Sequence, residues 1–288
     1  MKHVLSIAAF EARLTLRMIR VWVLGIIALL SGIGTLGYYV FIHRVFSGFT
    51  GPASYIVREF GLIYSGLMGA LMLGLFAMFF VFDWRHRDRT SRFTVTYDGS
   101  EVTPLALAWG KFLGLTAPIF GFFLLLIPFQ IIASLIADLR LPLSAYLMGD
   151  WWLGLMAALP LPAMAFGIAA ALRSRALAII VPIVWFAGIL SLAFWAQVPE
   201  WVIAMLGGLT EIPIYSEFVG YQVDPIFWLQ RVSIIAQVVA FVSLGALGSW
   251  APARHAAARA RTRLLVLGSF LVLILSFAAS AFLYLRGV

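Results

Sequence analysis

The residues best suited to grip another macromolecule lie in one short segment, from Asp83 to Lys111. Its four closely spaced arginines are Arg85, Arg87, Arg89 and Arg92. Guanidinium groups make bidentate hydrogen bonds with carboxylates, so such a run can bind an acidic protein surface. The same arginines could instead only set membrane topology and contact lipid phosphates, and both interpretations stay open at this stage.

Catalytic and cofactor-binding patterns are missing from the sequence. Lys111 follows Gly110, but Phe112 comes next and Leu105 stands where a phosphate-binding loop would need its first glycine, so we expect no nucleotide site of that kind. The histidines are His3, His43, His86 and His255, and their spacing suits neither a metal ion nor a haem. We therefore predict no enzyme activity, no cofactor and no metal site in this chain.

The composition indicates an integral membrane protein. The 288 residues are 63% hydrophobic and 11% charged, whereas a soluble domain has about 25% charged residues. The net charge of +8 is better explained by basic residues on one side of a membrane than by nucleic-acid binding. The chain contains no cysteine, which excludes disulfides and thiolate metal sites.

Seven apolar stretches are long enough to cross a bilayer, which takes ~20 residues. They are Val21–Ile42, Gly61–Phe82, Phe112–Ile136, Trp151–Leu172, Ala176–Trp195, Ile226–Trp250 and Leu264–Leu285. The expected fold is an all-α, polytopic helical bundle that forms a single transmembrane domain over residues 1–288. It has six core spans and a seventh, extra C-terminal span at residues 264–285.

The basic residues orient this bundle. Fifteen of the twenty lysines and arginines precede span one or lie in the loops after spans two, four and six. Residues 197–225 lie on the opposite side, which is rich in carboxylates. The positive-inside rule then predicts a cytoplasmic N-terminus, and we expect the membrane to be a bacterial inner membrane. Arg231 falls just inside span six, where we expect it to snorkel outward with Asp224 as a surface partner.

Two short helices are predicted at the cytoplasmic surface. Residues 1–20 place Leu5, Leu16 and Ile19 on one apolar face flanked by Arg13, Arg17 and Arg20, which predicts an amphipathic helix in the membrane interface. The apolar run from Leu105 to Ala137 is too long for one span. Pro104 is therefore expected to begin a short helix that Gly110 ends before the true span starts.

These features together resemble a known family. The order is the basic run Asp88-Arg89-Thr90-Ser91-Arg92, a polar turn, Thr103-Pro104-Leu105 and then Gly110-Lys111-Phe112-Leu113-Gly114. It resembles the cytoplasmic segment between the second and third spans of ABC-2-type permease subunits of ATP-binding-cassette transporters. The N-terminal Phe10-Glu11-Ala12-Arg13 is similar to the interfacial connecting helix of that family.

The resemblance implies that residues 83–111 form a coupling segment, which docks into a separate ATPase subunit. The expected coupling residues are Arg85, Arg87, Asp88, Arg89, Arg92, Thr103, Pro104, Leu105 and Trp109. It further implies a dimer, with a second copy or a sister permease, that exports a substrate with energy from the ATPase. Membrane lipids are the other expected partners.

Two other functions remain open at this stage. The chain could anchor or assemble a complex in the membrane without transport. It could also be a lipid-modifying enzyme that uses Asp83, Asp88 or the outer carboxylates, although no histidine or serine pairs with them in sequence. The apolar spans suit a lipid-like, amphipathic or polymeric cargo better than a small ion.

Overall fold

The computed structural model describes most of the chain. The described residues are 2–46, 58–82, 84, 88, 102–136, 146, 158–172, 174–195, 198–206, 214–216, 220–222, 225–248 and 256–286. Arg85, Arg87, Arg89 and Arg92 of the predicted coupling segment lie outside these ranges, as does Asp224.

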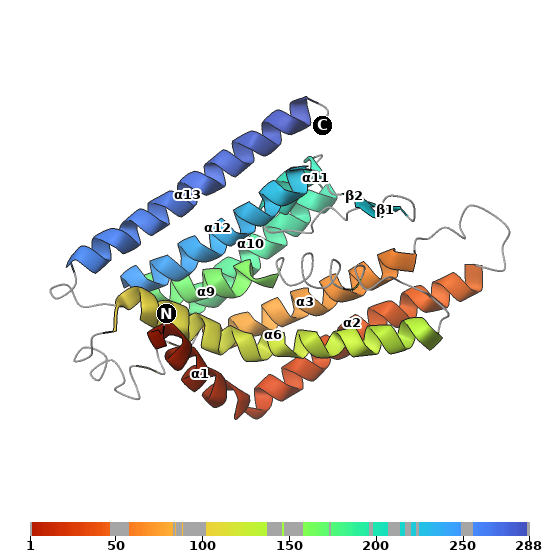
Figure 1. Cartoon of the computed structure of the whole chain (residues 1–288), viewed down its shortest axis with the longest axis horizontal. Coiled ribbons are helices and arrows are strands. Elements are labelled where there is room, and N and C mark those ends of the chain that lie inside the picture. The colour runs from red at the N-terminus through yellow and green to blue at the C-terminus, as the bar shows by residue number, and fades with distance from the viewer. Residues whose placement is uncertain are drawn as a thin grey trace.

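The described residues form long helices and one small hairpin (Figure 1). In chain order the elements are α1 (Lys2–Leu16), α2 (Ile19–Phe46), α3 (Arg58–Val81), α6 (Pro104–Ile136), α9 (Pro160–Ala171), α10 (Arg175–Trp195), α11 (Glu200–Met205), β1 (Ile214–Ser216), β2 (Gly220–Gln222), α12 (Pro225–Gly248) and α13 (Ala256–Leu285). The strands β1 and β2 pair antiparallel, with Tyr215 opposite Tyr221.

Four helical stretches are long and apolar enough to cross a membrane: Ile19–Ile42, Pro104–Ile136, Pro225–Gly248 and Ala257–Leu285. Many of their large apolar side chains are exposed, such as Leu30 at 61% and Leu267 at 66%. Exposing many large apolar side chains costs free energy in water but not in lipid. The helical fold is confirmed, and the four helices indicate an integral membrane protein. Shorter apolar helices occur at Ser65–Val81, Pro160–Ala171 and Ala176–Ile189.

The helices pack in two groups, which meet where α6 contacts α12 and where α3 contacts α9. In one group, α2 and α3 pack on each other and on α6. Gly25 makes close packing possible there, because a Cβ at that position would lie 2.6 Å from the ring of Phe122. In the other group, α12 lies between α9 and α13 and also contacts α6 (Figure 1). At Gly167 of α9 a Cβ would meet the Phe241 carbonyl oxygen of α12 at 2.5 Å, so these two backbones approach closely.

The helix α13 rests on α12 through a stripe of small side chains. Thr262, Ser269 and Ser276 repeat at seven-residue spacing and are buried. Each hydroxyl donates to the carbonyl of the residue four positions earlier, at 2.9, 2.7 and 2.8 Å. With its hydrogen bond made within its own helix, each side chain acts as a small apolar surface on which another helix can lie.

The prediction of a separate short helix that begins at Pro104 and ends at Gly110 is wrong. Pro104 begins α6, which continues without a break for 33 residues to Ile136. Thr103 caps it, since its hydroxyl accepts the Ala106 amide at 3.3 Å. Gly110 does not end the helix because it serves a packing role: a Cβ there would lie 2.7 Å from the Cβ of Ile7 in α1.

Candidate functional site

A buried lysine joins three segments that are far apart in the sequence. The Nζ of Lys111, in α6, donates to Asp88 Oδ1 at 2.6 Å and to Glu11 Oε1 at 2.9 Å. Lys111 is 1% exposed, Glu11 7% and Asp88 8%. We call these three residues the ion network. It ties α1, the predicted coupling segment and the first turns of α6 to one another.

Two glycines of α6 bring Glu11 to this lysine. A Cβ at Gly114 would lie 2.5 Å from the Cβ of Glu11 and 2.6 Å from the carbonyl oxygen of Ala8. Gly110, one turn earlier, makes the same close approach to Ile7. Since residues four apart share a helix face, the two glycines form a shallow track on which α1 lies. The backbone contact then places the carboxylate beside Lys111.

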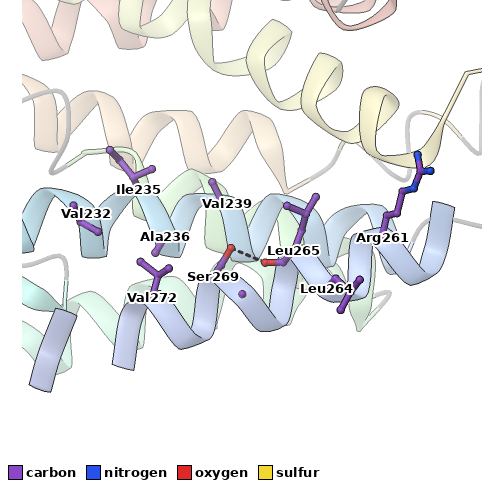
Figure 2. A pocket seen from close by; sticks show the side chains of 10 residues that line it. Val232, Ile235, Ala236, Val239, Arg261, Leu264, Leu265, Ser269 and Val272 are labelled. Atoms are coloured by element: carbon purple, nitrogen blue, oxygen red, sulfur yellow. Dashed lines mark hydrogen bonds between the residues drawn. The ribbon is translucent and has the colours of Figure 1, made fainter. Parts of the chain in front are cut away.

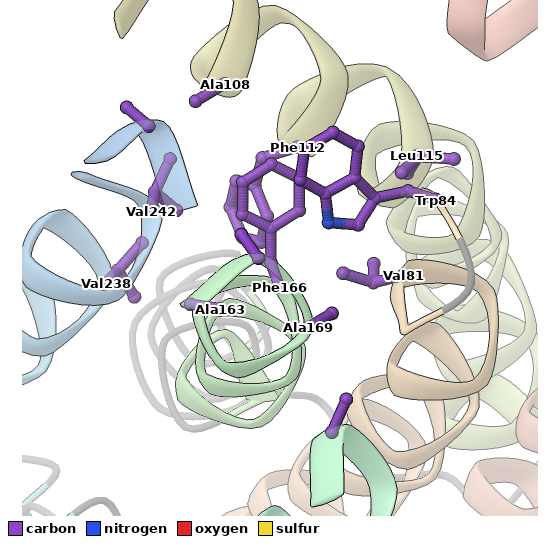
Figure 3. Close-up of a cluster of buried hydrophobic side chains, with 13 residues drawn as sticks. Val81, Trp84, Ala108, Phe112, Leu115, Ala163, Phe166, Ala169, Val238 and Val242 are labelled. Atoms are coloured by element: carbon purple, nitrogen blue, oxygen red, sulfur yellow. The ribbon is translucent and has the colours of Figure 1, made fainter. Parts of the chain in front are cut away.

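An aromatic cluster, drawn in Figure 3, lies close to the lysine. Lys111 Nζ is 5.8 Å from the centroid of the Trp84 ring. Trp84 stacks on Phe166 of α9, with the centroids 4.6 Å apart, and Phe166 meets Phe112 of α6 edge-on. Trp84 is 3% exposed. The chain just after α3 is therefore held between α6 and α9 by rings as well as by charge.

The ion network suits a mechanical role better than a catalytic one. A lysine that donates to two carboxylates is held as a cation and is poorly suited to act as a base or nucleophile. The helix α6 is about 50 Å long against a hydrocarbon thickness of ~30 Å. Lys111 lies seven residues from its start, about 10 Å along the axis. This places the network near one edge of the membrane.

The structure describes five of the nine predicted coupling residues. Asp88 lies in the ion network. Thr103 and Pro104 form the start of α6, and Leu105 and Trp109 are partly buried against the cluster of Figure 3. Their predicted contact with an ATPase stays a prediction. The predicted interface arginines Arg13, Arg17 and Arg20 are exposed, and Arg20 also lies over the Phe80 ring at 5.3 Å.

The face of α1 that packs on the protein differs from the one highlighted by its apolar periodicity. Ile7, Glu11 and Thr15 are the buried residues of α1, whereas Leu5 and Leu16 are 63% and 40% exposed. The apolar face is thus free to contact lipid, and the carboxylate points into the protein. The sequence does contain a signal for the pairing of Glu11 with Lys111. Glu11 is the only acidic residue before Glu59, and Lys111 is the only lysine besides Lys2.

A second buried cation lies in α12. Arg231 is 2% exposed, so the prediction that it snorkels outward is wrong. Its guanidinium carbon lies 4.4 Å from the centroid of the Phe227 ring. Among the described residues none of its three guanidinium nitrogens finds a hydrogen-bond acceptor, and the neighbouring Gln230 amide has no partner either. Because α12 has neighbouring helices on most sides, the side chain of Arg231 cannot reach the surface.

No group of three or more histidine, aspartate or glutamate side chains lies close enough to hold a metal ion in the part of the chain that the structure describes. Comparisons with protein-family models, curated proteins and solved structures found no match. The site must therefore be interpreted from its own geometry.

Proposed function

We propose that the chain is the permease subunit of an ATP-binding-cassette exporter. It is driven by ATP hydrolysis in a separate nucleotide-binding subunit, and two permease subunits, identical or sister chains, form the translocation path. The subunit lies in the bacterial cytoplasmic membrane with its N-terminus inside. Seven spans cross that membrane, and α1 lies in the inner interface. The sequence resemblance between residues 83 and 114 is the starting point of this proposal.

The ion network is the observation that carries the proposal furthest. A permease must pass motion from a soluble ATPase to its spans, which requires a stiff link between the docking segment and the membrane helices. Asp88 belongs to the predicted docking segment and is bonded directly to Lys111 of α6. A buried, hydrogen-bonded ion pair in close-packed surroundings allows its two residues little relative movement. A displacement of the segment would therefore move α6 and, through Glu11, α1.

The two alternatives differ in what they require of these residues. A membrane anchor needs the same network only for stability, so binding experiments have to separate it from a permease. A lipid-modifying enzyme would need an accessible carboxylate. Asp88, one of its candidates, is buried and bonded to Lys111, which disfavours this alternative.

The test is the binding of an ATPase subunit, which is sought by its phosphate-binding loop among the proteins encoded next to this chain. We expect Arg87→Gln, Arg89→Gln and Arg92→Gln together to release the ATPase in a pull-down, because each lost charge-assisted bond at a partly buried interface costs about 2–5 kcal/mol. The matched control replaces Arg254, Arg259 and Arg263 by Gln, which removes three charges from a different basic segment.

Membrane insertion is checked in the same samples. Tyr215→Cys in the cysteine-free chain should be labelled from outside intact cells by an impermeant thiol reagent in both triple variants. Retained ATPase binding by the inserted 87/89/92 variant would assign these arginines to topology and lipid contact. Absence of any ATPase from the wild-type complex would favour the anchoring function.

A further inference from the structure

An apolar groove runs between α12 and α13 on the outside of the bundle (Figure 2). It has a volume of about 640 Å³. Its walls are Val232, Ile235, Ala236 and Val239 of α12 and Leu264, Leu265, Gly268, Ser269 and Val272 of α13, and Arg261 lies at one end. Both helices are long and apolar enough to span a membrane, so hydrocarbon surrounds this groove.

The walls of the groove offer nothing to a polar ligand. The hydroxyl of Ser269 donates to the Leu265 carbonyl oxygen at 2.7 Å, the dashed line of Figure 2, and is therefore satisfied within its own helix. The other wall residues are aliphatic or glycine. Hydrocarbon can fill such a space at no cost in lost hydrogen bonds.

The charged end of the groove is different. In Figure 2 the guanidinium of Arg261 lies at the end away from Val232 and Val272. Arg261 makes no ion pair with any described residue. Neither α12 nor α13 contains an acidic residue. This end of the groove therefore attracts an anion, and no carboxylate of either helix competes for it.

The length of the groove matches one leaflet of a bilayer. From Arg261 to Val272 the helix α13 rises about 16 Å, at ~1.5 Å per residue. Half of a hydrocarbon core of ~30 Å is about 15 Å. A phospholipid with its phosphate at Arg261 would thus lay an acyl chain along the whole groove and end near the middle of the bilayer.

We propose that this groove is a binding site for one anionic phospholipid of the leaflet on the Arg261 side. The acyl chain fills the space between α12 and α13, and the phosphate accepts hydrogen bonds from Arg261. The lipid covers the apolar side of the contact between α12 and α13. The proposal requires only that the two helices span the membrane and is independent of the transport function.

Gly268 allows the groove to be closed without disturbing the fold. A Cβ at this position would meet no atom within 4 Å, so the side chain of Gly268→Leu has the groove itself to occupy. Gly188 of α10 is equally open but lies on another helix, which makes Gly188→Leu the matched control. For the charge, Arg261→Gln is matched by Arg263→Gln, an exposed arginine of the same helix outside the groove.

The full chain is purified in mixed micelles with phosphatidylglycerol or phosphatidylcholine of identical acyl chains, and retained lipid is counted by native mass spectrometry. We expect one phosphatidylglycerol per wild-type chain. Arg261→Gln should weaken its retention relative to phosphatidylcholine roughly fivefold, as expected for one basic residue at a lipid surface. Gly268→Leu should lower retention of both lipids, while the two controls should leave retention unchanged.

Three results would overturn the proposal. Equal retention by Arg261→Gln and Arg263→Gln would mean that the headgroup is not held at the groove. Equal retention by Gly268→Leu and Gly188→Leu would mean that the acyl chains lie elsewhere on the bundle. A Gly268→Leu chain that loses a dimeric form but keeps its lipid would assign the groove to a second copy of the chain.

Discussion

The two buried cations of this protein, Lys111 and Arg231, differ in the partners that surround them. Lys111 donates to two carboxylates and lies near one edge of the membrane. Arg231 is equally buried but faces only the ring of Phe227 in the described part of the chain. Burying an unpaired charge lowers the folding stability by roughly several kcal/mol. The comparison therefore predicts that Lys111 stabilises the fold and that Arg231 destabilises it.

Loss of the lysine should have the largest effect. Lys111→Met leaves two buried carboxylates without their shared cation, and we expect unfolding in detergent to become easier by about 3–5 kcal/mol. Thermal unfolding followed by tryptophan fluorescence measures this. Lys2→Met, which removes the chain's other, exposed lysine, is the control and should behave like the wild type.

A compensated variant sharpens this result. Glu11→Gln and Asp88→Asn added to Lys111→Met remove the stranded charges, and most of the lost stability should return. If Lys111→Met were as stable as Lys2→Met, the ion network would have no structural role.

Loss of the arginine should change the stability in the opposite direction. Arg231→Met replaces a buried guanidinium, which has no hydrogen-bond partner among the described residues, by an apolar side chain of similar length, and we expect the unfolding free energy to rise by about 1–4 kcal/mol. Arg286→Met is the matched control, because Arg286 lies at 4.3 Å over Phe282 in the same four-residue spacing but is exposed. A lower stability of Arg231→Met would show that an anionic group pairs with Arg231 in the membrane protein.

The smallest effect should come from the ring. A double-mutant cycle of Phe227→Leu with Arg231→Met isolates the attraction between the guanidinium and the ring, for which we expect about 0.5–2 kcal/mol. The same cycle with Phe282 and Arg286 should give a smaller coupling energy because water screens that pair. Equal couplings in the two cycles would mean that burial does not strengthen the Arg231 contact.

The ion network shows where prediction from this sequence stops. The sequence predicts Asp88 as a contact for an ATPase and places Glu11 and Lys111 in two separate motifs. Their pairing spans 100 residues of chain between Glu11 and Lys111. Glu11 and Lys111 come together because α1 lies on Gly110 and Gly114. The sequence does not show this helix contact.

Gly110 illustrates the same difficulty at one residue. A glycine near the start of a long apolar run is compatible with a helix end and with a close helix contact. The local sequence favours neither, and only the position of Ile7 shows that the second applies. The prediction that Arg231 snorkels is wrong for a related reason, because snorkelling depends on free space around a helix and α12 has neighbours on most sides.

The sequence alone determined that the chain is helical and embedded in a membrane, because hydropathy and helix length are local properties summed along the chain. It also indicated which segment could bind a partner, through its run of arginines. Tertiary structure decided which face of α1 is buried, that α6 is one helix, and that a lysine and two carboxylates meet at its start. These depend on which backbones approach each other, and that is settled by packing between helices far apart in the sequence.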